Sequence, residues 1–321
     1  MGSLLGTITL AGLLAGPAAA STVRADFQVS GTQVTLSDDA GESNRLDVRV
    51  PPQAGEIRFH DVASPIDPQG KRCEEVPAGT FRVDCELAGQ LYFELELDAG
   101  GGDDELTSDI DARYEGFKVS FVHIFGGTGA DRIDSGGAED TIDPGPGEDS
   151  VRAGGGYDLM AAGPADDGPD LYDAGPAGGT VSYAERLKPT TVRLDRVAND
   201  GGAGEGDNVV RALGAAGGEA RDTFTGNDRR NYLFGGAGPD RLRGRAGDDA
   251  ITGDAGADRI NAGPGDDFVL DGGSAGIDVI DCGPGRDLYE ADDRDEVTNC
   301  EIPLGPGRSS KAESRLREAK G

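Results

Sequence analysis

The chain has 321 residues, of which 54 are glycine, 17 are proline and none is tryptophan. Glycine and proline are poor helix formers, so this composition argues against long helices and against a large close-packed enzyme core. A net charge of −30 argues against a nucleic-acid partner, because phosphate neutralisation needs clustered Lys and Arg. Such a composition is typical of disordered chains unless it is periodic.

The first twenty residues have the pattern of a secretory signal peptide. An apolar stretch over residues 4–15 is followed by Pro17 and three alanines before Ser21, a typical cleavage site. The stretch is shorter than a membrane span, and no other apolar run reaches that length. We expect residues 1–20 to direct secretion, with an uncleaved anchor or a misassigned start as the alternatives.

Residues 21–98 are predicted to form a small N-terminal β domain. Strand-like alternation occurs over residues 23–36, 46–50, 53–59 and 90–97, and again over residues 117–125. Cys73 and Cys85 flank a turn sequence, which predicts a hairpin with a disulfide. The simplest role is a cap on the first coil of the repeats, because an open sheet end templates aggregation. A ligand-binding module is the alternative.

A nine-residue repeat follows in two blocks, 99–182 and 217–301. The sixth position of the first block holds Asp131, Asp140, Asp149 and Asp158, with Asp104 as an earlier outlier. In the second block it holds Asp222, Asn231, Asp240, Asp249, Asp258 and Asp267, and after a two-residue insertion Asp278 and Asp287. The eighth position is apolar throughout, at Ile133, Ile142, Val151, Met160, Phe224, Leu233, Leu242, Ile251, Ile260, Val269, Ile280 and Tyr289.

The segments outside the two blocks lack this period. Residues 174–181 have no acid at the sixth position, so the first block is expected to end there. Residues 183–216 are predicted to be an inserted loop or coil, with a strand at 190–194 and Asp207 as a weaker ligand candidate. Residues 302–321 are predicted to be a flexible basic tail.

Six residues rich in Gly and Asp favour a tight turn, because glycine permits a positive φ. The three residues around the apolar position form a short strand with one inward side chain. Turn plus strand is half a coil, so residues 18 apart stack, about 4.8 Å between coils. This predicts an all-β solenoid in which Asp131 lies beside Asp149, Asp140 beside Asp158, Asp222 beside Asp240, Asp240 beside Asp258, and Asp249 beside Asp267.

Carboxylates stacked this closely repel one another and raise each other's pKa. A hard cation between them reverses this effect, because Ca²⁺ takes six to eight oxygen ligands from carboxylates and carbonyls. The alternative for each Asp is an ordinary turn acid that caps its own backbone. The regular phase of the acids favours the metal.

The segment Gly235–Arg243 resembles the hemolysin-type, or RTX, nonapeptide repeat G-G-x-G-x-D-x-U-x at every specified position. The resemblance implies a parallel β-roll that binds several Ca²⁺ ions through the sixth-position Asp and the carbonyls of the second and fourth residues. The candidate ligands are Asp104, Gly127, Gly129, Asp131, Gly136, Asp140, Gly145, Gly147, Asp149, Gly154, Gly156, Asp158, Gly218, Asp222, Gly236, Gly238, Asp240, Gly247, Asp249, Gly256, Asp258, Gly263, Gly265, Asp267, Asp278, Gly283, Gly285 and Asp287. The pattern is imperfect where Ala138 and Ala220 replace the fourth-position glycine and where Arg245 and Asp254 replace the second.

Cys282 opens one nonapeptide and Cys300 lies 18 residues later. One full coil would place them on adjacent coils, within the usual Cα separation of a disulfide, about 4.4–6.8 Å. We predict that this pair closes the last coil.

The chain shows no convincing catalytic motif. It lacks H-E-x-x-H and a phosphate-binding loop, and the G-x-S-x-G letters around Ser274 fall in the repeat insertion without strand-to-helix context. His60 and His123 are expected to be packing or surface residues. The sequence therefore predicts a secreted, non-catalytic calcium-binding β-roll that folds on binding Ca²⁺ outside the cell. An adhesion protein with the roll as a spacer and a cryptic hydrolase are the alternatives.

Overall fold

A computed structural model describes residues 97–108, 122–164, 167–271 and 276–304 with their side chains, and elsewhere only the backbone of strands. The chain divides into two compact units: residues 1–163 with 167–179, and residues 164–166 with 180–321. Among the described residues, no helix is long and apolar enough to cross a membrane. The predicted all-β class is confirmed, because every described regular element is a strand.

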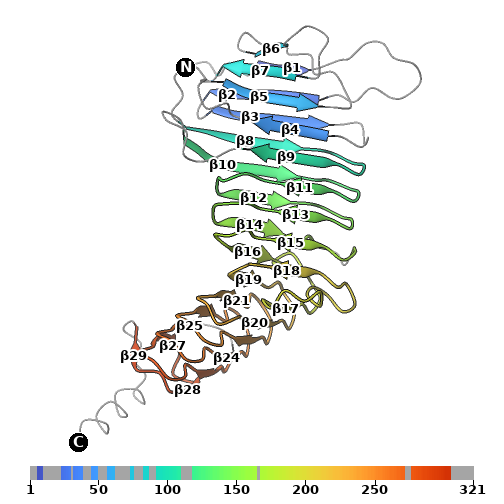
Figure 1. Cartoon of the computed structure of the whole chain (residues 1–321). Coiled ribbons are helices and arrows are strands. Elements are labelled where there is room, and N and C mark those ends of the chain that lie inside the picture. The colour runs from blue at the N-terminus through green and yellow to red at the C-terminus, as the bar shows by residue number, and fades with distance from the viewer. Residues whose placement is uncertain are drawn as a thin grey trace, which may run out of the picture. The chain divides into compact units, whose positions relative to one another are not determined.

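The first unit begins with seven strands, most of them paired antiparallel (Figure 1). These are β1 (Gly6–Thr9), β2 (Val23–Val29), β3 (Thr32–Asp38), β4 (Arg45–Arg49), β5 (Glu56–Asp61), β6 (Cys73–Glu75) and β7 (Arg82–Glu86). The strand-like alternation noted over residues 23–36 falls on two antiparallel strands, β2 and β3. Cys73 pairs with Cys85 in the β6–β7 register, as the hairpin prediction requires. A chain cleaved after Ala20 would lack β1.

The rest of the first unit is parallel. Its strands are β8 (Tyr92–Asp98), β9 (Glu105–Asp109), β10 (Lys118–Phe125), β11 (Arg132–Asp134), β12 (Asp140–Asp143), β13 (Ser150–Arg152), β14 (Asp158–Ala161) and β15 (Leu171–Asp173). From β8 onward, even-numbered strands up to β14 pair in one sheet and odd-numbered strands in another, which Figure 1 shows as two stacks. Ile133 pairs with Val151, so residues 18 apart stack as predicted.

The second unit repeats this plan over shorter strands. They are β16 (Gly179–Ser182), β17 (Thr191–Arg193), β18 (Asn208–Val210), β19 (Gly214–Ala216), β20 (Thr223–Thr225), β21 (Tyr232–Phe234), β22 (Arg241–Arg243), β23 (Ala250–Thr252), β24 (Arg259–Asn261), β25 (Phe268–Asp271), β26 (Val279–Asp281), β27 (Leu288–Ala291), β28 (Glu296–Thr298) and β29 (Ile302–Pro303). One sheet runs in the order β16, β19, β21, β23, β25, β27, β29, and the other β17, β20, β22, β24, β26, β28. The segment 183–216, predicted as a loop or coil, contains three of these strands.

The core is a column of single apolar residues, one from each short strand. All twelve predicted eighth-position residues are buried, with at most 6% of the side chain exposed. Such a thin core buries little apolar surface per residue, so the turns carry an unusual share of the stability.

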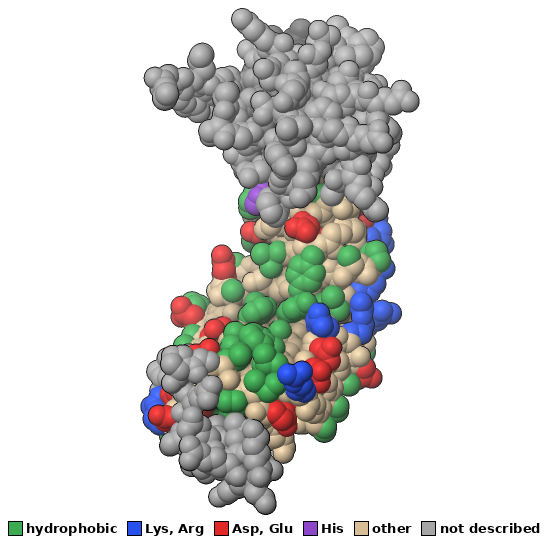
Figure 2. Space-filling model, turned by 90° about the vertical axis from the view of Figure 1, so that its left-hand side faces the viewer, with side chains coloured by type: hydrophobic (Ala, Val, Ile, Leu, Met, Phe, Trp, Pro, Cys, Tyr) green, Lys and Arg blue, Asp and Glu red, His purple; other side chains and the backbone are tan. Residues whose placement is uncertain are grey.

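The outer faces of the second unit differ in character. The outward residues of β22 and β24 include Arg241, Arg243 and Arg259, all exposed. The outward residues of β21 and β25 include Phe234 and Phe268, exposed by 40% and 38%. Figure 2 shows that hydrophobic side chains gather on one face of the molecule.

Candidate metal centre

The sixth-position acids are buried because of the strand period. Asp140 lies two residues before Ile142, and successive strand residues alternate in direction, so both side chains point inward. The same spacing holds in every repeat, and every sixth-position residue that the sequence singled out is at most 3% exposed. Each coil of two repeats therefore buries one or two acidic side chains together with two apolar ones, as at Asp240, Leu242, Asp249 and Ile251.

The carboxylates stack in ladders, which we define by one recurring hydrogen bond. Within a ladder, the backbone N–H of one sixth-position residue donates to the Oδ1 of the ladder acid one coil later, over 2.7–3.1 Å. In the first unit the ladders run Asp104, Asp131, Asp149, Asp170 and Asp140, Asp158. In the second unit they run Asp222, Asp240, Asp258, Asp278, Asp295 and Asn231, Asp249, Asp267, Asp287, Glu301. All five predicted stacked pairs are confirmed.

For most ladder acids, the second carboxylate oxygen has no donor among the residues that the structure describes. No described residue gives a hydrogen bond to the buried Oδ2 of Asp131, Asp149, Asp158, Asp240, Asp249, Asp258, Asp267 or Asp287. An unpaired buried carboxylate oxygen is costly, so it needs either a proton or a cation.

These oxygens lie against the first residue of the repeat, which is glycine at several repeats of the second unit. A Cβ at Gly235 would lie 2.6 Å from Oδ2 of Asp240 and 2.6 Å from the carbonyl oxygen of Gly253, one coil later. A carboxylate and a carbonyl oxygen thus lie close to each other beside a glycine, at a position that has no room for a side chain. This all-oxygen donor set fits Ca²⁺, which binds carboxylates and backbone carbonyls.

The second- and fourth-position glycines are required by the close approach of successive coils. Gly263 has a φ of +108°, and the carbonyl oxygen of Arg245, one coil earlier, occupies the place of its missing Cβ. Gly265 meets the carbonyl of Gly247 in the same way. This packing accounts for these glycines independently of whether their carbonyls bind an ion. Arg245 and Asp254 keep the turn despite their side chains, with φ values of 81° and 63°.

Burial raises the pKa of the ladder acids, and neighbouring acids add to the effect. Burial is the largest cause of the raised pKa of Asp149, about 8, and backbone donation from Asp131 opposes it. The pKa values of Asp240 and Asp249 rise to about 7 for the same reasons. Near neutral pH these groups are poised between protonation and ionisation, and a cation would favour ionisation.

Four acids of the site escaped the sequence pattern. Asp170 and Asp295 extend ladders at spacings of 21 and 17 residues instead of 18, and Glu301 closes the other ladder. Asp271, 3% exposed, stands at the first position of its repeat, where the repeats one and two coils earlier have Gly253 and Gly235. Asp170 could have been found from the sequence, because Asp170 and Tyr172 have the acid and apolar spacing of the repeat.

The weaker candidate Asp207 belongs to a different arrangement, the buried ion-pair cluster of Tyr183, Arg186, Glu205 and Asp207. Arg186 donates from both terminal nitrogens to Glu205, over 2.8 and 3.1 Å, and the two side chains are 1% and 0% exposed. The Tyr183 hydroxyl donates to Asp207 over 2.9 Å, and the Arg186 guanidinium lies 5.5 Å from the centre of the Tyr183 ring. Here a protein side chain supplies the buried positive charge.

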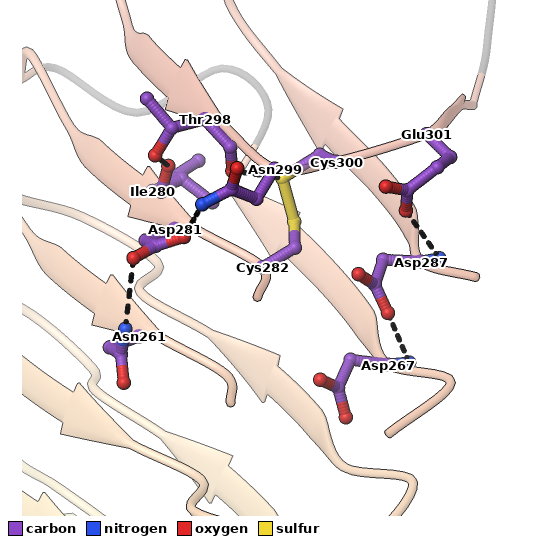
Figure 3. The surroundings of a disulfide bond; sticks show 10 residues. All are labelled: Asn261, Asp267, Ile280, Asp281, Cys282, Asp287, Thr298, Asn299, Cys300 and Glu301. Atoms are coloured by element: carbon purple, nitrogen blue, oxygen red, sulfur yellow. Dashed lines mark hydrogen bonds between the residues drawn. A yellow bond between two sulfur atoms is a disulfide. The ribbon is translucent and has the colours of Figure 1, made fainter. Parts of the chain in front are cut away.

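The last coil is closed by a disulfide between Cys282 and Cys300, as predicted (Figure 3). Their Cα atoms are 5.2 Å apart, one coil of 18 residues along the chain. Beside the disulfide, Glu301 accepts a hydrogen bond from the N–H of Asp287, and Asn299 donates to Asp281. Ser274 and the side chain of His60 lie outside the described residues, and His123 is partly exposed on β10.

A family model described as the RTX calcium-binding nonapeptide repeat (4 copies) matches residues 123–151, 216–249 and 234–269. The matched residues include Asp131, Asp140 and Asp149 of the first unit and the second-unit ladders from Asp222 to Asp267. No curated protein matches the chain in sequence.

Proposed function

We propose that this chain, an RTX-type β-roll protein, is a non-catalytic protein that binds several calcium ions along its carboxylate ladders outside the cell. The observation that carries the proposal is a buried Oδ2 that has no donor among the described residues and lies close to a backbone carbonyl oxygen of the next coil, as at Asp240. The Cys282–Cys300 disulfide and the predicted signal peptide agree with an oxidising, extracellular location.

Calcium would decide whether the roll folds. Extracellular modules bind calcium with dissociation constants of about 10⁻⁴–10⁻³ M. At ten times the dissociation constant, each site adds about 1.4 kcal/mol to the free energy of unfolding. Several such sites together reach the total stability of an ordinary domain, about 5–15 kcal/mol. In low calcium the same acids repel one another, so the chain stays unfolded until it leaves the cell.

The test is far-UV circular dichroism of the protein without residues 1–20, first with a chelator and then with millimolar Ca²⁺. We expect strand content to appear on addition of calcium and to disappear when excess chelator follows. Magnesium at the same concentration is the control and should substitute poorly, because it prefers a tighter octahedron and keeps its waters. Equal strand content with chelator and with calcium would contradict the proposal.

A further inference from the structure

One place in the second unit brings together three buried carboxylates instead of the stacked pair. One carboxylate oxygen from each of Asp258, Asp271 and Asp278 lies within 4.8 Å of the others. Two ligands on opposite sides of a Ca²⁺ ion are about 4.6–5.2 Å apart, so a common ion can bind all three oxygens. The three side chains are 1%, 3% and 0% exposed.

Asp271 makes this place different from the rest of the ladders. Asp258 and Asp278 are ordinary ladder members whose Oδ1 atoms each accept a backbone N–H. Neither oxygen of Asp271 receives a hydrogen bond from any described residue, although the side chain is almost completely buried.

The side chain of Asp271 also lies against Gly253, the first residue of the repeat one coil earlier. A Cβ at Gly253 would lie 2.6 Å from Oδ2 of Asp258 and 2.8 Å from Oδ1 of Asp271. At the equivalent place beside Gly235, the second oxygen comes from a backbone carbonyl. Beside Gly253 a carboxylate oxygen takes the place of that carbonyl, so this position carries more negative charge than the one beside Gly235.

The charged groups around Asp271 do not compensate for its burial. Those that perturb its pKa are all acids: Asp278, Asp258, Asp295 and Asp254. Burial is nevertheless the largest cause of its raised pKa, about 8. Arg294, which lies near Asp278, is already paired with Asp292 over 2.8 Å on the surface.

We propose that Asp258, Asp271 and Asp278 form a three-carboxylate calcium site that binds its ion at least tenfold more tightly than the two-carboxylate sites of the ladders. This inference rests on the proposed function, since it ranks one site among several for the same ion. More carboxylate charge at a calcium site raises its affinity. As calcium rises, this site fills first, and ordering of the roll starts near β25 and β26.

The test is equilibrium dialysis of the full mature chain against ⁴⁵Ca²⁺ over a range of free calcium. The wild type should bind one ion at a free calcium concentration at least tenfold below that needed for the others. Asp271→Asn and Asp271→Gly should both lose this early ion and keep the rest, because the second variant restores the usual first residue of the repeat. Loss of a supporting group alone costs metal affinity about 10–100-fold, so loss of a direct ligand should be easily measured.

Asp254→Asn is the matched control. It removes the same charge from an exposed side chain that acts on Asp271 only at a distance, and the early ion should remain. Circular dichroism in saturating calcium verifies that each variant reaches the wild-type fold. A wild type whose ions all bind over one concentration range, or an Asp271→Asn isotherm equal to that of the wild type, would overturn this inference and leave the proposed function intact. A wild type that binds no calcium would overturn both.

Discussion

The ion-pair cluster and the carboxylate ladders of the second unit solve the same electrostatic problem in two ways. Both bury acidic side chains at stacked turns with almost no exposure. In the cluster, Glu205 is neutralised by Arg186 and also accepts the N–H of Gly202 over 2.5 Å. In the ladders, Oδ2 of Asp240 or Asp249 has no described donor. The first solution is complete within the chain, whereas the second depends on an ion from solution.

The largest difference between the two regions should appear when pH changes in the absence of calcium. Ladder acids such as Asp240 have a folded pKa raised from 3.8 to about 7, so the folded state binds more protons than the unfolded state between these values. Their stabilising contribution to the free energy of unfolding is complete below pH 3.8 and is lost as pH rises through about 7. Between pH 5.5 and 8, each such acid should cost about 2 kcal/mol of unfolding free energy.

Circular dichroism of calcium-stripped protein, titrated from pH 8 to pH 5.5, measures this effect as the strand content that appears without calcium. We expect strand structure to be more stable at pH 5.5. Saturating calcium should abolish or reverse the trend, because the ion takes the place of the proton. A calcium-free protein that gains stability from pH 5.5 to 8 would show that the ladder acids are not the groups that destabilise it.

The next effect is on the ion-pair cluster. Arg186→Gln leaves Glu205 buried without its cation and should lower the unfolding free energy of the second unit by about 3–5 kcal/mol. Added calcium should not restore the loss. Arg230→Gln is the control, because Arg230 and Asp248 form an exposed pair 3.6 Å apart, for which about 0–1 kcal/mol is expected.

Urea titration in saturating calcium measures both variants. The double variant Arg186→Gln, Glu205→Gln should recover part of the loss, because no buried charge is left unpaired. If calcium rescued Arg186→Gln fully, the cluster would depend on metal like the ladders, and the contrast between the two regions would fail.

The smallest change in unfolding free energy comes from Asp240→Asn, and its direction should depend on whether calcium is present. In calcium it should lower the unfolding free energy by about 1–3 kcal/mol, because a charged ligand is lost. Without calcium it should have no effect or stabilise, because it removes one repelling charge. The native Asn231 shows that the fold accepts this side chain, whose Oδ1 accepts the N–H of Asn227 over 2.7 Å.

Asp228→Asn is the matched control for this prediction. It removes an equal charge from an exposed turn residue of the same region and should be nearly neutral under both conditions. Thermal unfolding in calcium gives the first value, and the strand content that remains with chelator gives the second. An equal loss for Asp240→Asn under both conditions would mean that Asp240 acts as a turn acid and not as a ligand.

The repeat made most of the fold predictable from sequence. The position of a residue in the nine-residue repeat determines its place in the coil. This rule predicts the 18-residue register, the buried apolar column, the stacked pairs and the Cys282–Cys300 disulfide. Asp170 was hidden because an insertion shifts it out of phase, although the coil still places it on Asp149. Asp271 was hidden because an acid at a glycine position reads as an interruption of the motif.

The ion-pair cluster could not be predicted, for a different reason. Arg186 and Glu205 are 19 residues apart in a segment without a period, so only the folded chain shows that they meet. The contacts of Asp200 were equally unpredictable: its carboxylate accepts hydrogen bonds from the backbone N–H groups of Arg193 and Val209. Such pairings depend on tertiary contacts and leave no pattern in the sequence.

The ladder hydrogen bond gives the roll a polarity along the chain. In the second unit, the sixth-position N–H groups from Asp222 to Asp287 donate forward, to the coil that follows, so each of these coils is complete only when the next coil has folded onto it. When the chain is made from its N-terminus, the hydrogen bonds of the ladders are therefore complete only after the C-terminal coils have folded. There Asp295 and Glu301 accept the last two N–H groups, and the Cys282–Cys300 disulfide holds that terminal coil in place. The C-terminal coil therefore ends both ladders of the second unit. Internal coils could be added or lost without changing this end.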